Sequence, residues 1–283
     1  RDGAGVGPRI ATLTPVASWL PQTGVDLSGT TVTVSGSSKT VTGIDFTGYR
    51  LINTGNNNIF EDCIGDFNTT GQTGNKRQWD IRGANPTVRY CKITNPTPIG
   101  GVYGLATFDA TGTITLDHND VRDAAAQDVI AGPDVGGGSN VLIVTETLIK
   151  GIHLTVGAHV DTIDGRGGAP GSTISRNFII GDKTPTSAPA GSGTGFTNAF
   201  HDLPTDPHGS PCNGWIIIEN IIVGSDDPGA QSIFVQVGNS ASTGIRMYDI
   251  IYDLREHNSL LHPSVRVDDW YARSFDYAAS LTA

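Results

Sequence analysis

The chain has 283 residues, with 37 glycines, one Met and only 16% charged residues, a composition typical of a β-rich, turn-rich protein. The formal net charge of −10 argues against a nucleic acid as partner, because phosphate binding needs a basic surface. It also disfavours an anionic glycan, unless a cation or a local basic patch intervenes. No run of 18 apolar residues is present, so neither a transmembrane helix nor a membrane partner is expected.

Residues 1–28 are rich in Pro and Gly, and we predict a linker and cap for them. The first eight residues have the composition of an interdomain linker. A cap is expected because the open end of a stacked sheet exposes unpaired backbone groups.

A short pattern recurs through residues 29–254: an apolar residue, two others, a small polar residue, one other, and an apolar residue. Its copies are centred on Asp62, Cys91, Asn119, Glu146, Asn177, Asn220 and a degraded copy at Ile250. The steps are 27 to 31 residues, with one exception of 43. A single repeat of this length cannot bury its apolar face, so neighbours must stack at the sheet spacing of about 4.8 Å. The pattern therefore predicts an all-β solenoid of about eight coils.

The asparagines at 119, 177 and 220 are predicted to occupy a bend between strands. Asn tolerates the left-handed conformation, and its side chain can bond backbone groups of the next coil. The repeat also stacks Cys63 near Cys91 at a spacing that permits a disulfide, although buried thiols are the expected state.

A second short strand is predicted after each motif, at residues 79–82, 105–108, 128–130, 160–164, 198–201 and 233–237. Aligning these strands places Asp164 beside His201 on the next coil. The 43-residue step predicts a long loop within 183–214, where Pro and Gly are dense. Residues 255–283 are predicted to form a C-terminal cap, with a short helix at 268–278 that places Trp270, Phe275 and Tyr277 over the last coil.

The repeats resemble those of right-handed parallel β-helix proteins of the pectate-lyase-like superfamily, over roughly residues 29–254. The resemblance rests on segments such as Gly112-Thr113-Ile114-Thr115-Leu116-Asp117-His118-Asn119-Asp120-Val121 and Ser172-Thr173-Ile174-Ser175-Arg176-Asn177-Phe178-Ile179. It implies a right-handed parallel β-helix and an activity on polysaccharide.

Residues 159–164 are similar to the Asn-Thr-Asp-Gly-aromatic/aliphatic-Asp run of polygalacturonase-type glycoside hydrolases. This similarity implies a catalytic role for Asp161. The segment departs from the run, with His159 in place of Asn and Thr162 in place of Gly. The chain also has no convincing Asp-Asp pair on the following coil, no Gly-His-Gly and no Arg-Ile-Lys motif.

The candidate site combines these residues with the long loop. We expect Asp161, Asp164, His159 and His201 to be catalytic, with a carboxylate as acid or nucleophile and a histidine orienting groups or relaying protons. Substrate binding is expected from Arg166, Asp202, Asp206, His208, Lys150 and Arg176. No metal motif is present and no cofactor is predicted, but Asp161, Asp164, Asp202 and Asp206 carry the oxygen ligands that suit Ca²⁺. In a lyase, Arg166 or His159 would be the base, with Ca²⁺ neutralising the substrate carboxylate.

The sequence therefore predicts a secreted or surface-exposed protein that cleaves a polysaccharide, as a glycoside hydrolase or a polysaccharide lyase. The alternative is a non-catalytic glycan-binding, receptor-binding or structural module of a phage tail or bacterial surface protein. The linker-like start without Met is expected of such a module, which would assemble as a homotrimer or within a larger assembly.

Overall fold

The computed structural model describes the chain in segments. These are residues 5–66, 76–94, 102–107, 109–122, 128–132, 139–150, 153–154, 161–165, 169–180, 193–194, 198–202, 213–223, 233–237, 244–253, 259–261 and 269–274. Within them no helix is long and apolar enough to span a membrane.

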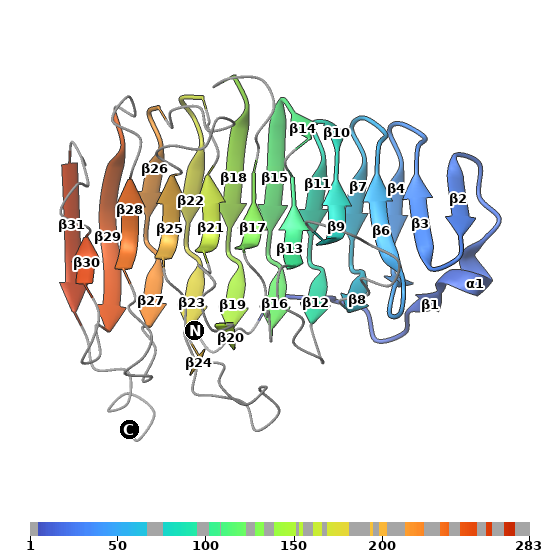
Figure 1. The fold of residues 1–283 in the computed structure, drawn as a ribbon, viewed down its shortest axis with the longest axis horizontal. Helices are drawn as coiled ribbons and strands as arrows, with labels where there is room; N and C mark the ends of the chain where they lie inside the picture. The colour runs from blue at the N-terminus through green and yellow to red at the C-terminus, as the bar shows by residue number, and fades with distance from the viewer. Residues whose placement is uncertain are drawn as a thin grey trace.

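Two long sheets run side by side along the molecule (Figure 1). The first sheet contains β1 (Thr14–Pro15), β4 (Thr40–Thr42), β5 (Ile44–Asp45), β7 (Ile59–Glu61), β8 (Ile64–Asp66), β11 (Thr87–Arg89), β12 (Lys92–Thr94), β15 (Thr113–Asp117), β16 (Asp120–Arg122), β18 (Val141–Thr145), β19 (Leu148–Lys150), β22 (Thr173–Ser175), β23 (Phe178–Ile180), β26 (Ile216–Ile218), β27 (Ile221–Val223), β29 (Arg246–Asp253) and β31 (Asp269–Ser274). The second sheet contains β2 (Val25–Ser28), β3 (Thr31–Val34), β6 (Arg50–Asn53), β9 (Lys76–Ile81), β13 (Val102–Ala106), β17 (Asp128–Ala131), β21 (Asp161–Gly165), β25 (Asn198–Asp202), β28 (Ile233–Val237) and β30 (Ser259–Leu261).

The strands of the coils pair in parallel with their counterparts one coil later, as in β9 with β13 and β13 with β17, whereas β2 and β3 at the start of the second sheet pair antiparallel. Two small sheets, β10 (Gly83–Ala84) with β14 (Ala110–Thr111) and β20 (His153–Leu154) with β24 (Gly193–Thr194), lie beside them. The predicted all-β parallel helix is confirmed.

The bend in the first sheet differs by one residue from the predicted one. The left-handed residue, with φ between 51 and 57°, comes directly before the buried residue of each copy, and the set is Asp62, Tyr90, His118, Glu146, Arg176 and Glu219. The following residue is buried, and that set is Cys63, Cys91, Asn119, Thr147, Asn177 and Asn220. The buried residues from Cys91 to Asn220 follow one another at intervals of 28, 28, 30 and 43 residues.

The buried asparagines bridge neighbouring coils, as predicted. Asn177 Oδ1 accepts a hydrogen bond from the Thr147 N–H at 2.9 Å, and its Nδ2 donates to the Val144 carbonyl at 3.0 Å. Asn220 repeats the arrangement one coil later, with Oδ1 accepting from the Asn177 N–H at 3.0 Å. These side chains satisfy backbone groups that the bend leaves without a sheet partner.

Replacing Asn177 by Ala is expected to lower the free energy of unfolding by about 2–4 kcal/mol, because each unsatisfied buried polar group costs about 1–3 kcal/mol. Denaturant unfolding measures this loss. Asn56→Ala is the control. Asn56 is exposed and accepts one hydrogen bond from the Ala84 N–H, so this substitution should lower the free energy of unfolding by less than about 1 kcal/mol. An equal loss in the two variants would contradict the bridging role.

The core is one continuous cluster from Val16 to Met247 and includes aromatic residues in the early coils. Trp79 packs against Phe46 and Phe60, with ring centroids 5.9 and 6.5 Å away. Cys63 and Cys91 are both buried free thiols, as expected, and burial raises the pKa of the Cys91 thiol. Cys212 lies outside the described residues.

The two ends are built differently. The helix α1 (Val16–Trp19) packs on the first coil, where Trp19 meets Phe46 edge to face. At the other end the helix predicted for 268–278 is wrong, because β31 continues the first sheet by pairing with β29. The predicted loop 183–214 is interrupted by β24 and β25; apart from these strands and residues 213–214, it lies outside the described residues.

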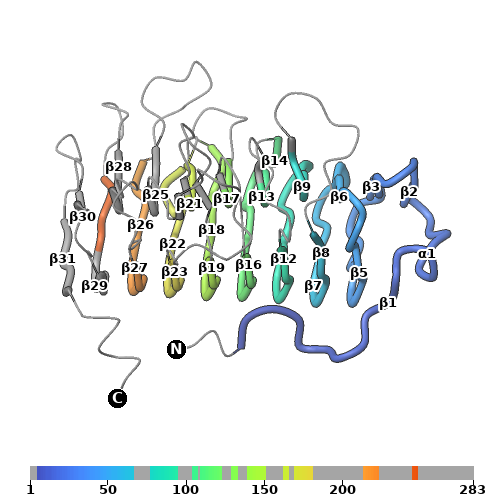
Figure 2. The backbone as a smooth tube through the Cα atoms, turned by 60° about the horizontal axis from the view of Figure 1, so that its bottom comes forward, coloured from blue at the N-terminus to red at the C-terminus, as the bar shows by residue number. Residues whose placement is uncertain are grey.

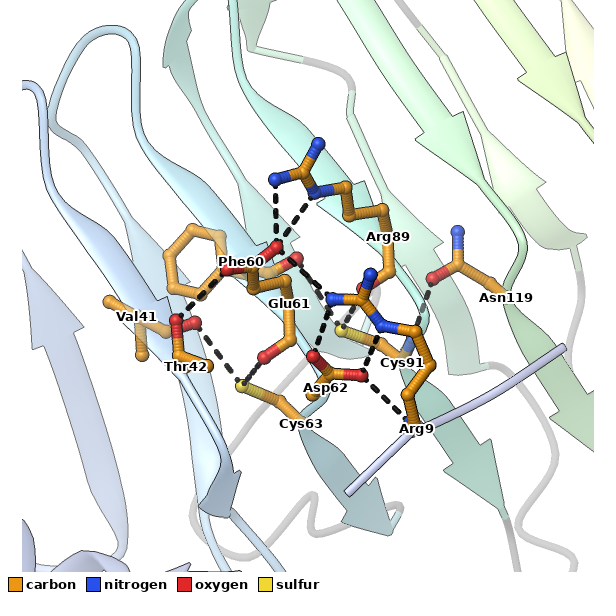
Figure 3. A network of polar contacts seen from close by, with 10 residues as sticks. All are labelled: Arg9, Val41, Thr42, Phe60, Glu61, Asp62, Cys63, Arg89, Cys91 and Asn119. Atoms are coloured by element: carbon orange, nitrogen blue, oxygen red, sulfur yellow. Dashed lines mark hydrogen bonds and ion pairs between the residues drawn. The ribbon is translucent and has the colours of Figure 1, made fainter. Parts of the chain in front are cut away.

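Residues 5–15 form a segment that we call the N-terminal strap, which follows the outside of the first sheet across several coils (Figure 2). Thr14 pairs with Ile44, and the Gly7 N–H donates to the His118 carbonyl at 2.9 Å. Between these points the Arg9 N–H and guanidinium donate to both carboxylate oxygens of Asp62, at 2.6 to 3.0 Å (Figure 3). The Arg9 guanidinium also lies 3.8 Å from the centre of the Tyr90 ring.

The strap should make stability depend on pH. The hydrogen bonds from Arg9 hold the pKa of Asp62 below its ordinary value of 3.8. A lowered folded-state pKa contributes stability that is present above 3.8 and lost as the pH falls through the folded pKa. Asp62→Asn is therefore expected to lower Tm by roughly 2–4 °C at pH 7, and the difference should decrease as the pH is lowered below 3.8. Calorimetry across this range measures it, with the exposed Asp26→Asn as control. A pH-independent difference would contradict the linkage.

Candidate functional site on the outer face of the second sheet

One line of residues along the second sheet faces away from the core. Trp79, Leu105, Ile130 and Ile163 belong to the core cluster, one on each of four successive strands. The next residue of each strand lies on the opposite face, and strand pairing joins Asp80, Ala106, Ala131, Asp164 and the backbone of His201 in that order. We call this set the outer row. Ala106 and Ala131 pack on each other separately from the main core.

The predicted register of Asp164 with His201 is confirmed, since the two residues are direct partners in the pairing of β21 with β25. Asp164 is only 1% exposed, and its backbone carbonyl accepts a bond from the Gly132 N–H at 3.0 Å. A buried carboxylate on the outer face is a candidate functional group, because it takes no part in the packing of the apolar core.

The other predicted catalytic and loop residues are only partly described. Asp161 lies on β21, where it pairs with Asp128 and Asn198. Asp202 ends β25 and pairs with Gly165. For these two and for His201 the structure describes the backbone alone. The remaining four, His159, Arg166, Asp206 and His208, lie outside the described residues, so their roles stay predictions.

The structure does not bring Lys150 and Arg176 to the outer row. Lys150 ends β19 in the first sheet and pairs with Arg122 and Ile180. Arg176 is a left-handed bend residue of the first sheet, and its guanidinium binds Glu146 and approaches Glu219 at 3.8 Å. Lys150 lies within a first-sheet strand and Arg176 directly follows one, so sequence proximity to Asp161 and Asp164 was a poor guide to sheet membership.

A group of charged side chains surrounds Asp80, the first member of the outer row. The sequence did not predict this group. Asp80 is fully buried and accepts hydrogen bonds from Arg50 at 2.9 Å, from Arg82 at 2.6 and 3.1 Å and from Arg77 at 3.3 Å. Arg77 also donates to Asp109 at 2.9 Å. We call these five residues the arginine cluster. Its sequence signal is Arg77 and Asp80 on β9, with Arg82 directly after the strand.

The arginine cluster holds more positive than negative charge. Three guanidiniums face two carboxylates, in a chain whose net charge is −10. The hydrogen bond to Asp80 raises the pKa of Arg82, whereas burial lowers the pKa of Arg50, and the charges of Arg82 and Arg77 add to that lowering. Among the described residues, the cluster is thus a concentration of arginine side chains in an acidic protein.

Calcium binding remains a prediction. Over the described segments, no three side chains of His, Cys, Asp or Glu are grouped so as to hold a metal ion. Of the four aspartates with suitable oxygen ligands, Asp164 is the one whose side chain is described.

Comparison with known proteins adds little. No family model matches the chain, and no curated protein matches it. The chain is similar to the crystal structure of the periplasmic alginate epimerase AlgG, with 10% sequence identity and a TM-score of 0.29. The match covers 87% of this chain and 61% of that one. We infer nothing about chemistry from a likeness of this size.

Proposed function

We propose that this protein acts on a polysaccharide outside the cell and cleaves it at the outer row of the second sheet. The observation that carries the proposal is that Asp164, on the face turned away from the core, is the direct strand partner of His201. Direct partners in a parallel sheet lie about 4.8 Å apart, close enough for a carboxylate to orient an imidazole.

The two cleavage chemistries use these groups differently. In hydrolysis, Asp164 would protonate the leaving oxygen or attack the sugar, with Asp161 as the second carboxylate. In elimination, a base would remove the proton beside a uronate carboxylate, and Ca²⁺ bound by Asp161, Asp202 and Asp206 would neutralise that carboxylate. Because Asp164 is buried, either chemistry requires whatever covers its carboxylate to give way to the substrate.

A second candidate is glycan or receptor binding without cleavage, by a module of a phage tail or bacterial surface protein that assembles as a homotrimer. The burial of Asp164 favours binding without cleavage, because a catalytic carboxylate has to reach the substrate. The arginine side chains near Asp80 are partly exposed, whereas the Asp164 carboxylate is not.

A panel of neutral and acidic polysaccharides distinguishes the two candidates. New reducing ends without ultraviolet absorbance indicate hydrolysis, and absorbance of unsaturated uronates indicates elimination. We expect one of these products from at least one polymer. Binding without any product across the panel would overturn cleavage and leave the second candidate.

A further inference from the structure

We propose that the row of bends under the N-terminal strap is a binding site for an extended, arginine-bearing segment, and that it accepts the strap of a second copy of this chain when its own strap is loosened. We call it the strap site, and it consists of Glu61, Asp62, Tyr90, His118, Leu148 and Ile180. The inference does not depend on the proposed function, because the strap site belongs to the first sheet.

The most specific part of the strap site is a buried carboxylate that receives an arginine (Figure 3). The side chain of Asp62 is 4% exposed, and its two oxygens accept hydrogen bonds from the Arg9 guanidinium at 2.6 and 3.0 Å. Asp62 also accepts from the Arg9 N–H at 2.8 Å, and Glu61 accepts from the guanidinium at 3.5 Å. The Tyr90 ring lies against the same guanidinium, with its centre 3.8 Å from the Arg9 Cζ. A carboxylate fork and an aromatic face together select a planar guanidinium over a lysine ammonium.

Further contacts continue along the first sheet and keep the bound segment extended. The Gly7 N–H donates to the His118 carbonyl at 2.9 Å, one coil beyond the tyrosine that contacts the arginine. Val6 packs against Leu148 and Ile180, which lie on the next two coils. The strap site therefore recognises a short pattern, an apolar residue, a glycine and an arginine, in register with successive coils.

The strap behaves as a ligand that is tethered to its own binding site. Arg9 binds residues 52 and 53 positions later in the chain, and Pro8 and Pro15 restrict the backbone, so little conformational entropy is lost when the segment binds. None of these contacts requires the strap and the strap site to belong to one molecule, so the strap of a second copy fits the same site. The tether gives the chain's own strap a high effective concentration, and a second copy competes once that strap is loosened.

A peptide with the sequence of residues 5–15 tests whether the segment binds as a separate ligand. It is labelled with fluorescein and titrated by anisotropy with the full chain carrying Arg9→Ala, whose own strap no longer holds Asp62. We expect this variant to bind the peptide at least about tenfold more tightly than the unsubstituted chain, in which the strap occupies the site. Equal binding by the two chains, or binding by neither, would overturn the inference.

Substitutions in the peptide and in the chain locate the binding site. Arg9→Ala in the peptide should weaken binding to the Arg9→Ala chain at least about tenfold, whereas Thr12→Ala, at an exposed residue of the strap, should leave it within about twofold. Adding Asp62→Asn to the chain should weaken binding by a similar factor, and adding the exposed Asp26→Asn should not. Equal effects of Asp62→Asn and Asp26→Asn would overturn the assignment of the site.

Gly7→Ala loosens the strap by a separate route and decides the question if the Arg9→Ala chain does not fold. Gly7 has a φ of +75°, and a Cβ at this position would lie 3.2 Å from the Cβ of Asp120. The full chain with Gly7→Ala should therefore also bind the peptide more tightly than the unsubstituted chain does. Unchanged binding in this variant would contradict the inference.

A mixture of two complementary variants tests the second copy as the partner. A tagged Arg9→Ala chain keeps an intact site, and an untagged Asp62→Asn chain keeps an intact strap that its own site no longer holds. We expect the tagged chain to capture the Asp62→Asn chain at least about tenfold more strongly than a chain that carries both substitutions. Equal capture of the two untagged chains would overturn the second copy as the partner.

Discussion

Asp164→Asn is expected to reduce polysaccharide cleavage at least about a hundredfold, since general acid–base catalysis typically contributes 10²–10⁴-fold. Asparagine has nearly the shape of aspartate, so the packing on the outer face of β21 should be retained. The readout is the initial rate of product formation on the polymer that the panel identifies, with Tm measured in parallel.

The control for this substitution is Asp120→Asn. Asp120 is also a largely buried aspartate outside the core, but it lies on the first sheet, where it accepts a bond from Arg122. Its substitution should leave the rate within about twofold. Equal rates of cleavage by the unsubstituted protein and by Asp164→Asn would show that Asp164 takes no part in the mechanism.

Asp80→Ala should lower the free energy of unfolding by about 3–5 kcal/mol, the typical cost of removing one partner from a buried ion pair. The loss follows from leaving three guanidiniums together without the carboxylate that holds them. For a protein of this size it corresponds to a fall in Tm of about 6–20 °C. Guanidinium chloride unfolding measures it directly.

An exposed ion pair provides the contrast. Glu219 is 51% exposed and lies 3.8 Å from Arg176, so Glu219→Ala should cost no more than about 1 kcal/mol. A loss of that small size in Asp80→Ala would show that the arginine cluster is held by something other than its central carboxylate.

The coil architecture could be predicted from the sequence because stacking imposes one spacing on every copy of the motif. The register of the second sheet could also be predicted, and strand pairing aligns Ile163 with Phe200 and Asp164 with His201. The copies of the motif centred on Asp62 and Glu146 mark the left-handed residue, whereas the copies centred on Asn119, Asn177 and Asn220 mark the buried residue that follows it. A shift of one residue moves a side chain to the other face of the sheet.

The arginine cluster could not be predicted, because its members meet only once the coil register is known. Arg50 lies 30 residues from Asp80, and Asp109 lies 32 residues from Arg77. The C-terminal strand β31 was missed for a related reason: sheet pairing with β29 decides its conformation, and local sequence does not reveal a partner more than 20 residues away.

The most direct test of the central claim is a crystal structure of Asp164→Asn with a bound fragment of the polymer that the binding measurements select. The claim is that ligand recognition takes place on the outer face of the second sheet. We expect sugar units of the fragment along the outer row of the second sheet, next to position 164. Fragment density confined to the first sheet would contradict this account.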